Sequence, residues 1–435
     1  MPKLIDAWKC YCLKALVLTT ILTVGGPAWG QGIALRGVST VNESMGGAAV
    51  ACPLDAAGAI HWNPASITGL PSSEMSFSLG LILPTSSLSS SVAANTFFPG
   101  SPAMSGSEDG EAGAVPGPSM AFVQKSCESK WAYGLGIMAI GGSAVNYPAS
   151  TTDPILLKQP FGLGQLAANV DIYQISPTVA YQLTEHWSIG FSPTITMGKL
   201  YADPLFLGPR EDGEWPAGIG TRYVWGGGCQ GGVYYKGDAG WNFGAALASP
   251  QWMEPFRYRS ISALGEPLSV NYDLNYPMVA SIGTSYTGFE RWTLACDVRY
   301  FDYADTTGFS GSGLNPDGSL KGLGWNSIMA VAVGAQRQMN DCVTLRCGYC
   351  FNEDPISSNV VQYNVASPMI TQHTAHVGAS FLLPGEWIAS VAYAHAFENS
   401  VTGPLHSATG AAIPGSSVTS TVSADVLSFG VTKRY

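Results

Sequence analysis

Three cysteines and two histidines in the C-terminal third of the chain have spacings that could hold a metal. Cys342, Cys347 and Cys350 form C-x4-C-x2-C, which is reminiscent of an iron–sulfur site, and His373 and His376 follow shortly after. Both groups fall in stretches that alternate like a strand, in which successive side chains point to opposite faces. Alternation separates Cys347 from Cys350, leaves Cys342 at a turn and puts the histidines on opposite faces. We therefore expect no metal site and no cofactor.

The other candidates for catalysis do not assemble into an active site either. The glycines of "WGGGCQGG" (225–232) belong to a strand rather than to a strand-to-helix turn, so they do not predict a phosphate loop. An outer-membrane lipase would need a serine, a histidine and an acid on one rim. His186 near one rim and His395 near the other lack such partners. The sequence predicts a protein that is not an enzyme.

The composition is that of a membrane protein built from strands. Only 11% of the 435 residues are charged and 46% are hydrophobic, whereas a soluble domain carries about 25% charged residues. Past residue 30 no run of about 18 apolar, uncharged residues occurs, which excludes spanning helices. Because only helices and closed barrels satisfy their backbone groups in lipid, short alternating apolar stretches predict a barrel. The net charge of −10 argues against a nucleic-acid partner.

A short polar turn followed by a tryptophan recurs along the chain, as in "LTEHWSIG" (183–190) and "LPGEWIAS" (383–390). Each turn joins a descending strand to an ascending one that begins at the tryptophan. Indole is amphipathic and settles where hydrocarbon meets headgroup, so we expect these side chains to form most of a periplasmic aromatic girdle. They are Trp131, Trp187, Trp241, Trp292 and Trp387.

Working outward from these turns predicts fourteen antiparallel strands. They cover residues 74–83, 119–126, 131–141, 169–183, 187–199, 221–235, 240–249, 270–287, 291–303, 323–338, 342–352, 371–383, 387–397 and 419–435. In "RWTLACDVRY" (291–300), Asp297 and Arg299 share one face and apolar residues the other, the lumen-in, lipid-out pattern of an outer-membrane strand. Short turns lie on one side and long loops on the other, as in bacterial barrels. The sequence predicts an all-β, 14-stranded transmembrane β-barrel over residues 74–435, in the bacterial outer membrane.

The two ends of the chain fit secretion and assembly into that membrane. Residues 1–30 combine three lysines, an apolar stretch and small residues before Gly30, so they predict a signal peptide cleaved after Gly30; the stretch is short for an uncleaved anchor. The last strand ends in the aromatic Tyr435, similar to the signal that outer-membrane proteins present to the barrel assembly machinery. We expect this machinery, outer-membrane lipid and lipopolysaccharide as partners of a monomer.

Residues 31–73 precede the first strand. Fourteen strands enclose a lumen too wide for the side chains of the wall to fill. The segment consists of small, mostly uncharged residues without strand alternation, and it lacks the charge and polarity of a disordered periplasmic tail. We interpret it as a hatch that plugs the lumen.

Several stretches of the chain resemble one protein family. The first is Asn63-Pro64-Ala65 after a Gly/Ala-rich run, and the others are "SPTVAYQLTEHWSIGFSPTI", "YPMVASIGTSYTGFERWTLACDVRYFDY", "VAVGAQRQMNDCVTLRCGYCFNEDPI" and "HVGASFLLPGEWIASVAYAHAF". In order and spacing they resemble the FadL/TodX family of outer-membrane transporters for long-chain fatty acids and hydrocarbons. The resemblance covers essentially the whole mature chain. It implies a fourteen-strand barrel with an internal hatch.

The resemblance also implies a route for the ligand. The ligand would bind first in a groove between extracellular loops, then in a pocket at the hatch N-terminus, and would leave sideways through the wall near the third strand. The loops correspond to residues 200–220 and 250–269, whose large apolar residues either bind ligand or pack among themselves. Ile33, Ala34 and Leu35 match the hatch positions that meet the acyl chain. The apolar loop residues are Leu205, Phe206, Leu207, Trp252, Met253 and Phe256.

A fatty-acid carboxylate would need a cation in the lumen. Strand alternation turns Arg299 and Arg346 inward, and Arg222 is a further candidate. An arginine can bind a carboxylate through two parallel hydrogen bonds. Each of these arginines could equally pair with Asp297 or with another carboxylate of the wall.

Gating residues are expected in the third strand and in the hatch. Gly134, Gly136, Gly141 and Gly142 would permit a kink or bulge, with Gly134 and Gly136 as the gating candidates. The Asn63-Pro64 bond would act as a stiff pivot. The leading hypothesis is a transporter for passive uptake of hydrophobic molecules, and the alternative is a nonspecific diffusion porin. Fatty acids, alkanes and aromatic hydrocarbons all remain open as substrates.

Overall fold

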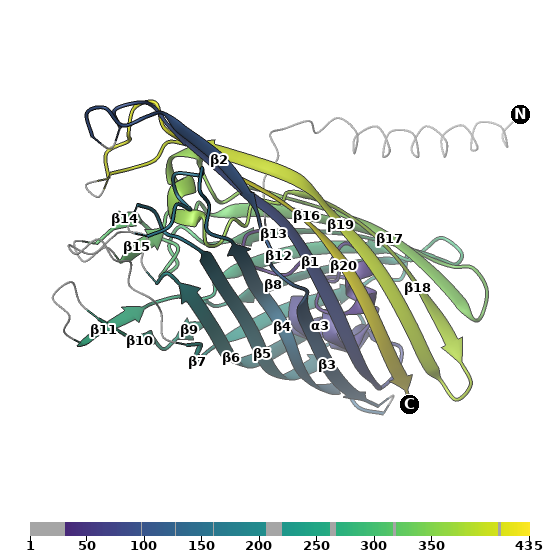
Figure 1. Cartoon of the computed structure of the whole chain (residues 1–435). Helices are drawn as coiled ribbons and strands as arrows, with labels where there is room; N and C mark the ends of the chain where they lie inside the picture. Colours follow the sequence, from purple (N-terminus) through teal and green to yellow (C-terminus); the bar gives the residue numbers. More distant parts are fainter. Residues whose placement is uncertain are drawn as a thin grey trace, which may run out of the picture.

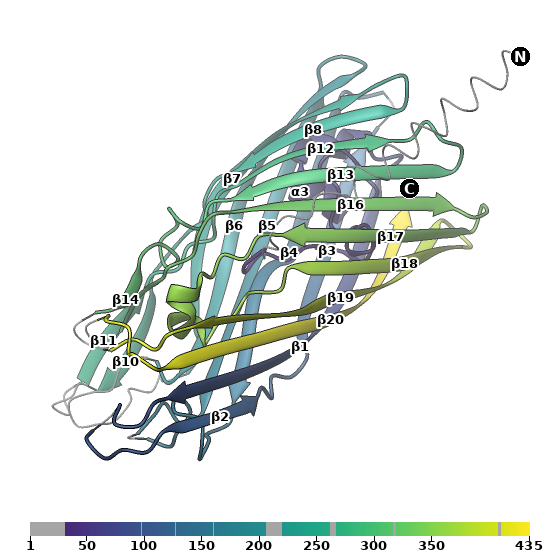
Figure 2. The ribbon, with the colours of Figure 1, turned by 90° about the horizontal axis from the view of Figure 1, so that it is seen from above.

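The computed structural model describes residues 31–96, 98–126, 128–159, 161–205, 220–261, 267–315, 319–407 and 410–435; the predicted signal peptide lies outside them. Within these residues an antiparallel sheet closes on itself as a barrel (Figure 1, Figure 2). Neighbouring strands follow the chain around the barrel, and β1 pairs with both β20 and β3 to close the ring. The predicted fourteen-strand barrel is confirmed.

The wall strands begin at the short-turn end with β1 (Glu74–Val92), which pairs with the last strand. The others are β3 (Val115–Lys125), β4 (Trp131–Tyr147), β5 (Leu166–Gln182), β6 (Trp187–Asp203), β7 (Arg222–Lys236), β8 (Trp241–Ala248), β12 (Val279–Tyr286), β13 (Trp292–Phe301), β16 (Ile328–Gln338), β17 (Val343–Asn352), β18 (His373–Leu383), β19 (Trp387–Gly403) and β20 (Ser417–Arg434). β12 is shorter than predicted, because residues 267–272 pair with a neighbouring loop segment instead of continuing the wall.

Alternating burial along the strands follows the predicted two-face pattern. In β13, Asp297 is 0% and Arg299 1% exposed, whereas Trp292 and Leu294 are each 38% exposed. The same alternation buries Cys350 and exposes Cys347, so the separation of the cysteines expected from the sequence is confirmed. Outward-facing side chains are apolar and inward-facing ones polar or small, as lipid outside and a filled lumen inside require.

The five girdle tryptophans are each the first residue of an ascending strand: β4, β6, β8, β13 and β19. Three of them contact a tyrosine on the next strand, with ring centroids 4.6, 5.0 and 4.7 Å apart. The other two are covered by the cations of Arg337 and Lys433. The tryptophans therefore occupy one end of the barrel, and their depth in the membrane stays a prediction.

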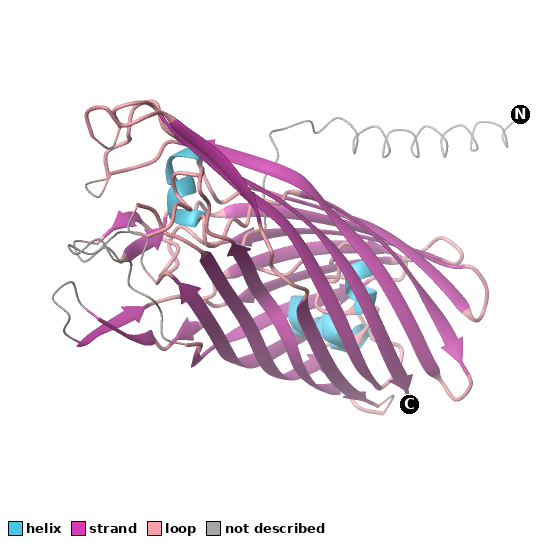
Figure 3. Cartoon of the chain, in the orientation of Figure 1, coloured by secondary structure: helices cyan, strands magenta, loops and turns pink. Residues whose placement is uncertain are grey.

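Residues 31–73, called here the N-terminal segment, lie inside the barrel (Figure 3). They form α2 (Thr40–Ser44), α3 (Ala56–Trp62) and the 3-10 helix η1 (Pro64–Gly69). Side chains of Ser39, Asp55 and Asn63 accept backbone hydrogen bonds at the starts of these helices, which satisfies N–H groups that have no partner within the helix. None of the helices among the described residues has the length and apolarity to cross a membrane.

The long-loop end carries further small elements. β2 (Met104–Asp109) extends the sheet beside β1, and β9 (Trp252–Met253) adds to β7. Two hairpins stand apart from the wall, β10 (Phe256–Ile261) with β11 (Pro267–Tyr272) and β14 (Ser312–Leu314) with β15 (Leu320–Leu323). The 3-10 helix η2 (Ser358–Asn364) folds back at this end of the barrel, against β19.

Candidate functional site

The wall of the barrel is incompletely paired between β3 and β4. β3 pairs with β4 over residues 119–125, and with β1 as far as Val115, opposite Ile82. β4 continues over residues 139–147 with β5 along one edge. Among the described residues, no wall strand pairs with the other edge of this stretch. We call this unpaired edge of β4, facing the start of β3, the wall gap.

The N-terminal segment supplies a partner for β4 at the wall gap. Residues 33–35 join residues 140–142 through two backbone hydrogen bonds of 2.9 and 3.0 Å, with Ala34 opposite Gly141. A Cβ on Gly141 would lie 2.9 Å from the carbonyl oxygen of Ile33, so glycine permits this close approach and a larger residue would have to displace that carbonyl. A short stretch of the N-terminal segment thus takes the place of a neighbouring strand.

The irregularity in β4 lies at Gly141, one of the four glycines predicted to permit a bulge, and not at the gating candidates Gly134 and Gly136. Gly134 and Gly136 are regularly paired with both β3 and β5, and the bulge falls between Ala139 and Gly141. At Gly134 and Gly136 an added Cβ would lie 3.0 and 3.1 Å from Ile60 of α3. These two glycines therefore make room for a helix of the N-terminal segment. The strand stays regular there and is irregular only between Ala139 and Gly141.

A cavity of about 150 Å³ lies behind the wall gap. Ile33, Ala34 and Leu35, predicted from the sequence to meet the ligand, all line it. Facing them are apolar or small residues of the wall, including Ile82, Pro116 and Val426. The cavity therefore joins the start of the N-terminal segment to the edges of β1, β3, β4 and β20.

Arg36 is the cation of this cavity, and the sequence analysis missed it. Its Nη2 donates to the hydroxyl and the carbonyl oxygen of Thr371, at 2.8 and 3.2 Å, and its Nε donates to Asn352 at 3.4 Å. Burial lowers the pKa of Arg36 from its usual range, which the neighbouring Cys350 and Glu43 oppose. One feature of the sequence could have pointed to Arg36: it is the only lysine or arginine in residues 31–73.

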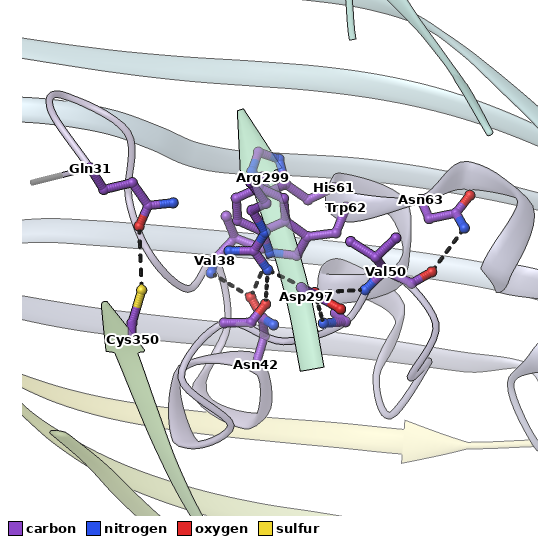
Figure 4. Close-up of polar contacts among 12 residues, drawn as sticks. Gln31, Val38, Asn42, Val50, His61, Trp62, Asn63, Asp297, Arg299 and Cys350 are labelled. Atoms are coloured by element: carbon purple, nitrogen blue, oxygen red, sulfur yellow. Dashed lines mark hydrogen bonds and ion pairs between the residues drawn. The ribbon is translucent and has the colours of Figure 1, made fainter. Parts of the chain in front are cut away.

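The two inward-facing arginines, Arg299 (Figure 4) and Arg346, are hydrogen bonded to protein groups in the lumen. Arg299 donates to Asp297 at 2.9 Å and to the carbonyl of Gly47, and its guanidinium lies 3.4 Å from the Trp62 ring centroid. This is the pairing with Asp297 that the sequence analysis left open. Arg346 donates to Gln336 at 2.7 Å and to Ser380 at 2.6 Å. Neither arginine lines the cavity behind the wall gap.

Asn63, Pro64 and Ala65 are tied to the wall at β6 and β7, two to three strands from β4. The Asn63 amide donates to the carbonyls of Val50 and Val233 at 2.8 and 2.9 Å, and its oxygen accepts from the Ala65 N–H at 3.1 Å. Pro64 begins η1, where a missing N–H costs nothing. A Cβ on Gly190 of β6 would lie 2.3 Å from the Ala65 nitrogen. This motif anchors the N-terminal segment closely against β6 and β7.

The apolar loop residues do not assemble into one surface. Leu205 is 3% and Phe256 0% exposed. These two residues therefore fit the alternative in which the apolar loop residues pack within the protein instead of forming an open ligand groove. Trp252 is exposed and Met253 half-buried, both on β9. Phe206 and Leu207 lie outside the described residues.

The sequence matches the model of a family described as outer membrane protein transport protein (OMPP1/FadL/TodX), over residues 21–203 and 231–435. The chain belongs to this family. It is therefore an outer-membrane transport protein for hydrophobic substrates, and the predicted localisation is confirmed. Members of the family are transport channels and not enzymes, which agrees with the prediction from the sequence. No curated protein sequence matches the chain.

Solved structures of family members share the fold of this FadL/TodX protein. A FadL homologue of Pseudomonas aeruginosa is similar with a TM-score of 0.69 at 15% identity, covering 93% of this chain and 99% of the other. The toluene transporter TodX of Pseudomonas putida gives a TM-score of 0.64 at 15% identity, covering 93% and 100%. The toluene transporter TbuX of Ralstonia pickettii gives 0.61 at 17% identity, covering 92% and 99%.

Proposed function

We propose that this FadL/TodX protein takes up hydrophobic molecules passively through the cavity at the start of the N-terminal segment and releases them sideways at the wall gap. The observation that carries the proposal is the position of the cavity directly behind the unpaired edge of β4. In this proposal residues 31–73 are the hatch of the barrel. Their contacts with strands all around the wall favour a plugged transporter over a diffusion porin.

Hydrocarbons are the substrate class that the cavity supports best. A cavity of about 150 Å³ lined by apolar groups is large enough for one aromatic ring, and each buried CH₂ contributes about 0.8 kcal/mol. Arg36 already donates to three oxygen acceptors, so the site does not need a carboxylate to satisfy it. Two of the structural neighbours are toluene transporters by name. A long-chain fatty acid would have to extend from the cavity into the gap or the loops.

The surroundings of the barrel follow from the same proposal. The outward apolar surface is to be covered by outer-membrane lipid and lipopolysaccharide. Tyr435, 69% exposed, is available to the barrel assembly machinery. A monomer suffices, because the route runs within one barrel.

A reversible lock tests the lateral route. Ala34 and Gly141 form a pair whose flanking backbone groups are hydrogen bonded, so their Cα atoms are expected about 4.5 Å apart, within the range that a disulfide spans. We expect Ala34→Cys/Gly141→Cys, when oxidised, to lose toluene uptake into outer-membrane vesicles, and to regain it on reduction. Reduction then releases the start of the hatch from β4.

The two single-cysteine variants are the controls for the six described native cysteines. The Gly141→Cys variant also measures the effect of displacing the Ile33 carbonyl. Uptake at the wild-type rate in the fully oxidised double variant would show that exit does not require the hatch to leave β4. Parallel assays with labelled toluene and oleate measure which class the protein prefers.

A further inference from the structure

Gln31, the first residue after the predicted signal peptide, lies in a closed environment. It is 2% exposed, and its backbone carbonyl accepts a hydrogen bond from the Tyr303 hydroxyl at 3.0 Å. Its side-chain Oε1 lies 3.9 Å from the sulfur of Cys350 (Figure 4). Its amide nitrogen Nε2 is buried without a hydrogen-bond partner among the described residues. An unpaired buried donor of this kind is destabilising, because it has lost its hydrogen bonds to water.

Cleavage after Gly30 would add a charge at the same place. The backbone nitrogen of Gln31 would become an α-amine, which is protonated at neutral pH, and burying a charge is costly unless it is paired. Two carboxylates of the lumen are already engaged, Glu43 with His376 at 3.1 Å and Asp297 with Arg299 at 2.9 Å.

A second cation, Arg36, is linked to the Gln31 side chain through two intervening residues. Cys350, which contacts Gln31, also contacts Asn352 Oδ1 at 3.3 Å, and this oxygen accepts from Arg36 at 3.4 Å. A charged amine at Gln31 would therefore be buried in the same part of the lumen as the Arg36 guanidinium, which is linked to the Gln31 side chain through Cys350 and Asn352. Repulsion adds to the cost of burial, and a neutral N-terminus would remove both.

We propose that Gln31 is converted to pyroglutamate in the mature protein. The α-amine attacks Cδ of its own side chain; a bond forms between the two, the Cδ–Nε2 bond breaks, and ammonia leaves with the proton released by the amine. The product is a neutral five-membered lactam, and no oxidant or co-substrate is consumed. The group that leaves is the nitrogen that lacks a partner, whereas Oε1 beside Cys350 is retained.

The modification would also keep charge away from the ligand. Gly32 and Ile33, the next two residues, line the cavity behind the wall gap. A cyclised Gln31 ends the chain beside that cavity with an uncharged ring, which suits an apolar ligand. The inference rests on cleavage after Gly30, and its chemistry does not depend on which substrate is carried.

Intact-mass spectrometry of the full-length protein, expressed with its own leader and freshly extracted from outer membranes, tests the proposal. We expect the mass of residues 31–435 less one ammonia, and an N-terminus that resists Edman sequencing until pyroglutamyl peptidase is added to the unfolded chain. Gln31→Ala is the control, because it is processed at the same bond and has no side chain to cyclise; its N-terminus should sequence directly.

Three outcomes would overturn the proposal. A mass of residues 31–435 with the amide intact would show cleavage without cyclisation. A mass that fits another N-terminus would show that Gln31 is not terminal. A lactam absent from fresh protein and formed only on storage would show that it is not part of the mature protein. None of these masses depends on transport, so the uptake assay stands or fails separately.

Discussion

Removing the carboxylate of Asp297 should unseat the N-terminal segment from the barrel. Asp297 Oδ2 accepts hydrogen bonds from the backbone N–H groups of Ala49 and Val50 at 2.7 and 3.0 Å, and from Arg299 at 2.9 Å. The Asp297 and Arg299 side chains are 0% and 1% exposed. Asp297→Ala would therefore leave a guanidinium buried without its counter-charge, in contact with Gly47 of the segment.

The expected size of the effect follows from this burial. Breaking a buried ion pair by deleting one partner costs roughly 3–5 kcal/mol. At 1.4 kcal/mol per tenfold change, the ratio of seated to released segment should fall by a factor of roughly 10² to 4 × 10³. If the segment occludes the lumen, ion conductance through single barrels in planar bilayers should become detectable in Asp297→Ala.

Two matched variants serve as controls, one for the unpaired charge and one for a fully open lumen. Asp297→Asn/Arg299→Met removes both charges and keeps a side-chain oxygen for the N–H groups of Ala49 and Val50, so the conductance should return toward the wild-type level. Deletion of residues 31–66 marks the fully open barrel. A silent Asp297→Ala barrel, beside a conducting deletion, would refute the view that this pair holds the segment in place.

Two further predictions concern groups of the N-terminal segment. Burial, and next the charge of Arg299, lower the pKa of His61 to about 3, so His61 is neutral when seated and takes up a proton when released, below its ordinary pKa of about 6.5. Its contribution to seating is full above that pH and is lost as the pH falls toward 3; ion conductance should rise between pH 7 and pH 4, and less so in His61→Gln. Arg36→Met should leave toluene binding within about twofold, because apolar contacts carry it. A selective loss of oleate binding of about tenfold would instead assign Arg36 to a carboxylate, and an unchanged pH profile in His61→Gln would remove histidine from the seating equilibrium.

The barrel could be predicted from the sequence because its signals are local and repeated. Each girdle tryptophan follows a polar turn and starts a strand, and side-chain alternation then fixes which face meets the lumen. Asp297 and Arg299 were placed inward on this basis, and both are buried. The end of β12 was misplaced because residues 267–272 also alternate, and only their pairing with residues 256–261 separates them from the wall.

The site could not be predicted in the same way, because it is formed by contacts between segments distant in sequence. The alternation of side chains along one strand does not reveal such contacts. The bulge in β4 lies at one of the four predicted glycines, Gly141, where Ala34 pairs with it. The sequence could not show that Gly134 and Gly136 instead leave room for Ile60. Arg299 and Arg346 were correctly turned inward, but their partners could not be read from one strand. Arg36 escaped notice because its partners, Asn352 and Thr371, lie more than 300 residues away.

The distribution of contacts indicates which part of the N-terminal segment can move. Residues 39–73 are held by polar groups around the wall: Thr40 contacts Ser428 at 2.7 Å, and Asn63 donates to Val233 at 2.9 Å. Glu74 and Asp297 accept from backbone N–H groups of the same residues.

Residues 32–38 have far fewer ties. Two backbone hydrogen bonds join them to β4, and the Arg36 side chain joins them to Thr371 and Asn352. A backbone hydrogen bond contributes about 0.5–1.5 kcal/mol net, so detaching this stretch from β4 costs far less than withdrawing the whole segment. If ligand leaves by the proposed lateral route, opening the wall gap would require only the first few residues to leave β4. The remaining residues would then keep the lumen closed to ions while an apolar molecule passes sideways into the membrane.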